Sequence, residues 1–134
     1  MIRLIAIAIV LALSVPLAAT TFQKIADTST AVPDETGTFD GFPDFEGPAI
    51  DSGKVVFLGY ENEPNIAGIY TNLNGPLEKI ADTLTQIPDA PLGDTFSSSA
   101  VHGFGTPSIS GQNITFRGDG DGVQLYAESM QNLA

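Results

Sequence analysis

One thirteen-residue stretch occurs twice in this chain, and this repetition constrains the fold more than any other feature. It reads FQKIADTSTAVPD at residues 22–34 and LEKIADTLTQIPD at residues 77–89, 55 positions later. Further blocks match downstream in the same order: TF at 38–39 and 95–96, PAI and PSI at 48–50 and 107–109, VVFLG and ITFRG at 55–59 and 114–118. Short apolar blocks in a fixed order, separated by loops of variable length, are typical of stacked or radial β-repeats.

Apolar runs bounded by Gly, Pro, Asn or Asp predict the strands. No long stretch has helical periodicity, so the sequence predicts an all-β fold. The predicted strands lie at residues 22–26, 54–59, 67–71, 77–81, 112–117 and 123–127.

The order of these strands predicts two four-stranded antiparallel units in one domain, residues 20–134, with repeats at 22–76 and 77–128 and a short C-terminal tail at 129–134. The first unit combines strands at 48–51, 54–59, 67–71 and 77–82 through short loops, which suits a meander. The second unit has strands at 107–110, 112–117 and 123–128 and lacks a fourth. Because residues 22–27 have the sequence of a fourth strand, we expect this N-terminal segment to complete the last sheet and shield its edge.

Several of these motifs resemble a known architecture. The run GIYT at 68–71, followed by Gly75 and LEKIAD at 77–82, resembles the outer half of a blade in TolB-like bacterial β-propellers. The combination of IADT, TxxP and VVFxG is similar to uncharacterised secreted repeat proteins of cyanobacterial type. This resemblance covers residues 22–128 and implies a propeller-blade-like architecture, not a reaction. Propellers have about four to eight blades, so several chains in a ring, a fragment of a longer protein, or two sheets packed face to face are all open.

The N-terminus has the pattern of a secretory signal peptide. Arg3 precedes an apolar run at residues 4–13, and a break at Pro16 is followed by Ala18 and Ala19. The apolar run is shorter than the ~20 residues that a spanning helix needs. We therefore expect residues 1–19 to be removed and the protein to be secreted or periplasmic, with an uncleaved membrane anchor as the alternative.

The expected mature chain is strongly acidic and has no cysteine. Its 4 basic and 16 acidic side chains give a formal charge near −12. Such a chain repels phosphate backbones and anionic lipid, so nucleic acid and membrane are not expected as partners. Without disulfides, an exported domain depends on its core, on metal or on partners.

The sharpest local motif is RGDGDG at residues 117–122. Alternating Asp and Gly can bring carboxylates onto one hard cation, so Asp119 and Asp121 are weak calcium candidates. An EF-hand loop needs further oxygen ligands and a terminal Glu, which the residues after 122 do not supply. A hairpin turn, which Asp-Gly pairs also favour, is the preferred interpretation.

Two long loops, residues 33–47 and 88–106, are the other candidate binding regions, because irregular loops on a β scaffold often hold sites. Phe39 and Phe96 occupy matching repeat positions and are expected to tuck beneath these loops as satellite core. The remaining aromatic residues of the loops are candidates for an exposed surface that binds a glycan or a neighbouring chain. They are Phe42, Phe45 and Phe104.

His102 is the sole histidine and a further candidate loop residue. A zinc site or a Ser-His-Asp triad would have to recruit partners for which the sequence shows no supporting spacing. An ordinary loop hydrogen bond is therefore the favoured interpretation of His102, and no catalytic residue is assigned.

The sequence favours a secreted, non-enzymatic binding or assembly module whose partner is a protein, a carbohydrate or another copy of the chain. One alternative is an exported glycan-acting hydrolase using loop carboxylates, which predicts a deep pocket with two facing acids. The other is a truncated piece of a larger repeat protein, which predicts exposed apolar edges at residues 55–58 or 114–116.

Overall fold

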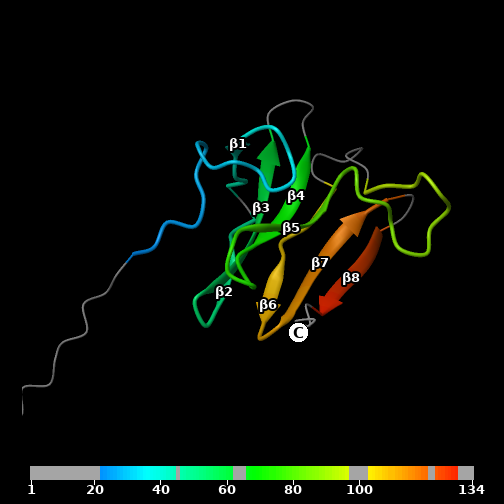
Figure 1. The fold of residues 1–134 in the computed structure, drawn as a ribbon. Helices are drawn as coiled ribbons and strands as arrows, with labels where there is room; N and C mark the ends of the chain where they lie inside the picture. Colours follow the sequence, from blue (N-terminus) through cyan, green and yellow to red (C-terminus); the bar gives the residue numbers. More distant parts are fainter. Residues whose placement is uncertain (1–21, 45, 62–65, 97–102, 121–122, 130–134) are drawn as a thin grey trace, which may run out of the picture.

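The computed structural model describes most of the chain as two antiparallel β-sheets (Figure 1). The residues described are 22–44, 46–61, 66–96, 103–120 and, by their backbone, 123–129. Their strands are β1 (Phe39–Gly41), β2 (Ala49–Asp51), β3 (Lys54–Glu61), β4 (Ala67–Thr71), β5 (Glu78–Asp82), β6 (Ser108–Ser110), β7 (Asn113–Asp119) and β8 (Val123–Ser129). No described segment forms a helix with the length and apolar character needed to cross a membrane.

The strands divide between a five-stranded sheet, called sheet 1, and a three-stranded sheet, called sheet 2. Sheet 1 has the order β1-β3-β4-β5, and β2 also pairs with β3. Sheet 2 has the order β6-β7-β8. The prediction of an all-β antiparallel fold is confirmed, and the predicted strands from residue 48 onward begin and end within two residues of those observed.

Two-residue turns set the register of both sheets. In sheet 1, Asp51 pairs with Lys54, and the turn between them has positive φ at Ser52 (50°) and Gly53 (79°). Positive φ at both central positions is the type I′ geometry, whose twist matches that of the flanking strands. In sheet 2 the corresponding turn has its positive φ at Gly111 (58°), the first central position, as in type II′.

The main core joins the two sheets. Side chains of β3 and β4 on one face of sheet 1 meet side chains of β7, and three aromatic rings from the second half of the chain pack among them. Ring centroids of Phe96 and Phe104 are 5.1 Å apart, and those of Phe104 and Phe116 are 5.7 Å apart. The buried members include Val56, Leu58, Ile69, Ile87, Phe96, Phe104, Ile114 and Phe116.

A second cluster covers the opposite face of sheet 1, which we call the outer face. Side chains alternate along a strand, so Phe57 points away from the neighbouring Val56 and Leu58 of the main core. Phe57 pairs across the strands with Tyr70, and Phe39 lies against both rings at centroid distances of 5.8 and 4.8 Å. Ile25, Ala26, Val55 and Leu77 pack around this cluster, which also contains Val32.

The N-terminal segment does not behave as predicted. Residues 22–27 form no strand, and among the described residues β8 pairs with β7 alone. Ile25 and Ala26 pack instead against the second cluster, on the outer face of sheet 1. The expectation that this segment completes the last sheet is therefore wrong within one chain, because its apolar side chains find cover on the sheet that follows it in sequence.

Two linker segments, residues 27–39 and 82–96, fold alike. In each, the first residue is an Asp that accepts at Oδ1 a hydrogen bond from the Thr hydroxyl three positions later, while the Asp N–H donates to that hydroxyl. Each linker also has an Asp with positive φ seven residues after this first Asp. The two distances are 3.0 and 2.9 Å for Asp27 with Thr30, and 2.8 and 2.9 Å for Asp82 with Thr85.

Each linker ends on a buried phenylalanine. The N–H of Phe39 donates to the carbonyl of Thr30, and the N–H of Phe96 donates to that of Thr85, both at 3.2 Å. Phe39 is 1% exposed and Phe96 is 2% exposed. The prediction that these two rings are buried is confirmed. Phe39 lies in the second, smaller cluster on the outer face of sheet 1, as expected of satellite core, whereas Phe96 is part of the main core between the sheets.

Candidate binding site on the outer face of sheet 1

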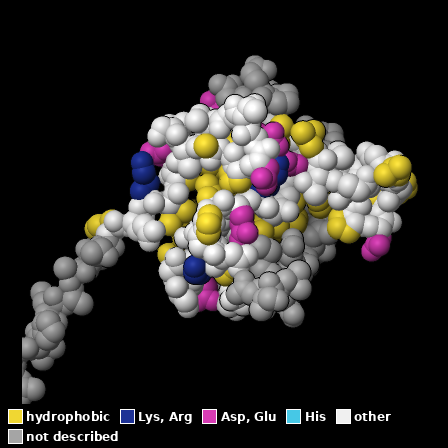
Figure 2. All heavy atoms as spheres, in the orientation of Figure 1, with side chains coloured by type: hydrophobic (Ala, Val, Ile, Leu, Met, Phe, Trp, Pro, Cys, Tyr) yellow, Lys and Arg dark blue, Asp and Glu magenta, His cyan; other side chains and the backbone are white. Residues whose placement is uncertain are grey.

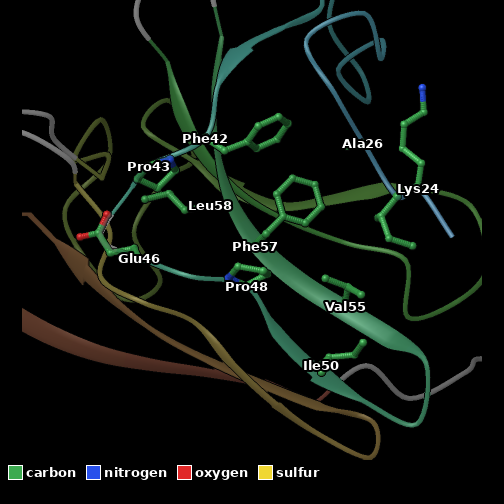
Figure 3. Close-up of a pocket in the computed structure, with 11 residues that line it drawn as sticks. Lys24, Ala26, Phe42, Pro43, Glu46, Pro48, Ile50, Val55, Phe57 and Leu58 are labelled. Carbon is green, nitrogen blue, oxygen red and sulfur yellow. The ribbon is translucent and has the colours of Figure 1, made fainter. Parts of the chain in front are cut away.

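A cavity of about 410 Å³ lies on the outer face of sheet 1 (Figure 3). The β2–β3 hairpin, the segment after β1 and the N-terminal segment form its walls. Figure 2 shows apolar side chains gathered on this side of the molecule, in the region where Figure 1 places β2 and β3. The lining residues are Lys24, Ile25, Ala26, Phe42, Pro43, Glu46, Pro48, Ile50, Val55, Phe57 and Leu58.

The strand register places the apolar lining. Ile50 of β2 pairs directly with Val55 of β3, and the period-2 alternation puts Phe57 on the same face as Val55. Phe42 follows the end of β1 and stacks its ring 5.6 Å from that of Phe57 and 5.4 Å from that of Phe39. These side chains form a continuous apolar wall, and Figure 3 shows them side by side along the hairpin.

This wall is open where the matching wall of sheet 2 is covered. Ile50 is 71% exposed, whereas its sequence counterpart Ile109 is half-buried against the main core. Val55 is half-buried, whereas its counterpart Ile114 is fully buried beneath sheet 1. Phe57 and its counterpart Phe116 are both buried, at 7% and 5% exposed, so the two matching sets of apolar positions differ at Ile50 and Val55. Among the described residues, only the set on sheet 2 has a sheet packed upon it.

Charged groups stand at the border of the cavity. Among its lining residues, the charged side chains are those of Lys24 and Glu46. Lys24 donates from Nζ to Asp27 Oδ2 at 2.6 Å, and this bond, followed by those from Ser29 and Thr30, holds the pKa of Asp27 well below its usual range. Lys24 thus already forms an ion pair within the N-terminal segment. The floor of the cavity is apolar, so it offers a ligand apolar contacts rather than hydrogen bonds.

A second polar feature is a partly buried cluster beside the second hydrophobic cluster. Tyr70 Oη donates to Glu61 Oε1 at 2.7 Å, and Lys79 Nζ lies 2.7 Å from Asp82 Oδ2 and 2.8 Å from Glu35 Oε1. Burial raises the pKa of Glu61, and the hydrogen bond from Tyr70 opposes this rise. For Lys79, burial lowers the pKa, but the bonds to Asp82 and Glu35 outweigh it and raise the pKa overall.

This cluster connects β3, β4 and β5 to the linker that contains Glu35, and its side chains do not line the cavity. It therefore serves as a structural cross-link. Sequence reasoning missed it, although a Lys three positions before an Asp recurs in both repeats and makes the ion pairs Lys24–Asp27 and Lys79–Asp82. The contributions of Glu35 and Glu61 required the folded arrangement.

The calcium candidates receive no further support. Asp119 Oδ1 is buried, accepts no hydrogen bond from the described residues and lies 3.5 Å from Arg117 Nε. Asp121 lies outside the described residues. Within the described part of the chain, no three His, Cys, Asp or Glu side chains come together as metal ligands. Calcium binding at Asp119 and Asp121 stays a prediction.

The structure separates the candidate aromatic residues. Phe42 is 38% exposed and lines the cavity, as expected of a binding surface. Phe104 is 1% exposed, so its predicted place in an exposed surface is wrong. It forms a β-bridge with Gly118, which draws its ring beneath sheet 2. Phe45 and His102 lie outside the described residues.

Comparisons with protein families, with curated proteins and with solved structures find no match to this chain. The geometry of the cavity and of the two sheets is therefore the basis for assigning a function.

Proposed function

We propose that the protein is an exported, non-enzymatic binding and assembly module that docks a partner protein on the outer face of sheet 1. In this proposal the two sheets are propeller-blade-like units, and the cavity is the place where a further sheet would pack. The observation that carries it is the open apolar wall, since the matching wall of sheet 2 is covered by sheet 1.

Burial of the side chains of this wall would contribute favourable free energy to docking. Removing a large aliphatic side chain such as Ile50 from water is worth about 1.5–3 kcal/mol when it is fully exposed at the start. Ile50 is mostly exposed, and Phe42 and Val55 are partly so. Several such side chains in one patch favour association, and contiguous apolar patches on soluble proteins mark interaction sites.

The chemistry of the lining favours a protein surface over a sugar or a polyanion. Oriented recognition of a small polar ligand depends on several convergent polar groups, and here Lys24 and Glu46 are the charged groups on a lining that is otherwise apolar. The net charge of −11 repels polyanions. An apolar face of another polypeptide meets neither obstacle.

The two alternative hypotheses gain no specific support. A glycan-acting hydrolase needs two facing carboxyl groups about 5–10 Å apart, and Glu46 is the single carboxylate in the cavity lining described here. The fragment hypothesis predicts exposed apolar residues at 55–58 or 114–116. Val55, which lines the cavity and is half-buried, partly fits that expectation, whereas Val56, Leu58 and Ile114 are at most 1% exposed.

Binding of a neutral solvatochromic dye tests whether the wall is open in solution. We expect dye fluorescence with the protein diluted until it is monomeric, when no partner covers this face, and loss of that fluorescence on Ile50→Ser, because the substitution replaces an apolar side chain of the cavity that is 71% exposed. Leu92→Ser is the matched control, since Leu92 is 99% exposed and lies outside the cavity. Dye binding that Ile50→Ser leaves unchanged would count against an open apolar face.

A further inference from the structure

We propose that the docked partner is a second copy of this chain, bound head to tail. Residues 22–27 of one chain add as a fourth strand to the free edge of β8 in the second copy, whose sheet 2 then covers the outer face of sheet 1. This inference rests on the proposed function, because it names the occupant of that same face.

The first argument is that residues 22–27 precede the linker that normally follows a paired strand. Their sequence matches that of β5, and β5 pairs with β4 through Gly68 with Asp82 and Thr71 with Glu78. The linkers that follow, at residues 27–39 and 82–96, share the same hydrogen bonds. The N-terminal segment thus has the sequence of a fourth strand and leads into the same linker structure, but it pairs with no strand in the described part of the chain.

The second argument is that β8 has the place in sheet 2 that β4 has in sheet 1. Phe116 of β7 pairs with Tyr126 of β8, just as Phe57 of β3 pairs with Tyr70 of β4. The far edge of β4 is occupied by β5, whereas no described strand pairs with the far edge of β8. An edge strand of seven residues presents unpaired N–H and C=O groups to which an extended segment can add.

The third argument is that pairing of residues 22–27 with β8 of a second copy would cover both the edge of β8 and the outer face of sheet 1. Within one chain, the linker after β5 carries Phe96 to a place beside Phe116, and sheet 1 covers that face of sheet 2. The linker after residue 27 already carries Phe39 to the matching place beside Phe57. If residues 22–27 pair with β8 of a second copy, sheet 2 of that copy is brought over Phe57 in the same manner.

Little is lost when the N-terminal segment moves from its own chain to the second copy. Phe22 is 97% exposed, and Ile25 and Ala26 are half-buried. The segment makes no strand pairing in its own chain that would have to be broken. The cavity wall that it uncovers is then covered again by the incoming sheet.

Each copy carries a formal charge of −11, but the charges at the two facing surfaces are locally compatible. Along β7 the residues that point away from the main core alternate with buried Ile114 and Phe116, and they include half-buried Thr115 and exposed Arg117. A guanidinium group stacks well on aromatic rings and pairs with carboxylates. Arg117 of one copy therefore suits a surface whose lining includes both Phe42 and Glu46 in the next.

A head-to-tail contact of this kind is heterologous, so it closes into a ring or continues as a filament. With two sheets in each chain, about two to four copies would supply the four to eight sheets of a propeller.

The absence of cysteine makes disulfide trapping a direct test. Transferring the pairing of Thr71 with Glu78 to the second copy places Gln23 opposite Ala127. Protein carrying Gln23→Cys is purified from cells expressing the full chain and mixed under mild oxidation with protein carrying Ala127→Cys. We expect a disulfide-linked heterodimer as the main product, and a discrete oligomer of the unmodified protein by light scattering.

The matched control replaces Ala127→Cys by Gln112→Cys, an exposed position in the β6–β7 turn, and should give little heterodimer. Equal trapping at both positions, or none at Ala127, overturns the inference. So does a disulfide confined to one chain when both cysteines are placed together. A monomer that still binds the dye through Ile50 rejects the second copy alone, whereas a monomer without this dye binding rejects the proposed function as well.

Discussion

Tyr70 and Glu61 form the most deeply buried polar pair in the described structure. Tyr70 is fully buried and Glu61 is 6% exposed. Burial raises the pKa of Glu61, the negative charges of Glu35 and Asp82 add to this rise, and the hydrogen bond from Tyr70 opposes it. The phenol hydroxyl therefore offsets part of the cost of keeping a carboxylate inside the sheet.

Removing that hydroxyl should destabilise the protein. We expect Tyr70→Phe to lower the free energy of unfolding by about 1–3 kcal/mol at pH 7, because it leaves a buried carboxylate oxygen without its donor. Urea unfolding monitored by circular dichroism gives this value. Tyr60→Phe is a comparison at a half-buried tyrosine of the neighbouring strand. An effect of Tyr70→Phe below about 0.5 kcal/mol, the range of ordinary surface substitutions, would contradict the role of the hydrogen bond.

Replacing the Glu61 carboxylate by a neutral amide should raise stability relative to wild type as the pH increases. Because the pKa of Glu61 is higher in the folded than in the unfolded state, the folded protein binds this proton more readily, and the contribution of Glu61 to stability falls as pH rises through the folded pKa. Glu61→Gln keeps an acceptor for Tyr70 and removes the charge. We expect the stability of the variant relative to wild type to increase between pH 4 and pH 7, measured by urea unfolding at both pH values. A relative stability that decreases over this interval would show that the pKa is lowered instead.

At the scale of elements, the two linkers contain the same Asp–Thr hydrogen bonds, one in an exposed and one in a buried environment. Asp82 has a side chain that is 4% exposed, and its ion pair with Lys79 and hydrogen bonds from Thr85 and Leu84 hold its pKa low against the opposing effect of burial. The corresponding side chain of Asp27 is 38% exposed. The same local hydrogen bonds are therefore screened by solvent in one linker and shielded in the other.

We expect Asp82→Asn to destabilise the protein by about 3 kcal/mol, as is typical when one partner of a buried ion pair is lost. Asp27→Asn, the matched control at the exposed position, should destabilise the protein less than Asp82→Asn, because solvent screens the same interactions there. Because the pKa of Asp82 is lowered in the folded state, its contribution is present above the unfolded pKa and disappears as pH falls through the folded pKa. Chemical unfolding of both variants at pH 7 and at pH 3 checks both statements, and equal effects of the two substitutions would refute the comparison.

The same elements show what the sequence could predict. The positions of β2 to β8 follow from apolar runs bounded by turn residues, and the burial of Phe39 and Phe96 follows from their matching repeat positions. The repeat did not reveal that residues 22–27 lie against sheet 1, because strand pairing depends on which edge is within reach. Nor did it reveal the burial of Phe104, which is decided by its bridge to Gly118.

The candidate site was less accessible to sequence reasoning than the fold. Phe42 was predicted as a surface aromatic residue, but the wall also needs Ile50 and Val55, which in sequence look like ordinary strand residues. Alternation shows that Val55 and Phe57 share a face. Whether that face is covered depends on how the two sheets pack, which the pattern of apolar residues does not specify.

For the whole molecule, the excess of acidic groups predicts an effect of salt. The formal charge is −11, and with 16 acidic and 5 basic side chains most carboxylates repel one another. Raising NaCl shortens the Debye length from about 30 Å at 0.01 M to about 8 Å at 0.15 M. We expect the thermal unfolding midpoint to rise over this range, because screening relieves repulsion in the compact state more than it weakens the half-buried ion pairs of Lys79. A midpoint that falls with added NaCl would show that attractive pairs dominate.

The short sequence range of each sheet has a consequence for synthesis. Every pairing in sheet 1 lies between residues 39 and 82, and every pairing in sheet 2 lies between residues 108 and 129. Local contacts form quickly, so sheet 1 can be complete while the remainder of the chain is still being translated. Val56 and Leu58 then remain uncovered until Ile114 is synthesised, 56 residues after Leu58. If translation pauses in that interval, sheet 1 is complete but its apolar face is still exposed to solvent. During such a pause, aggregation competes most directly with folding.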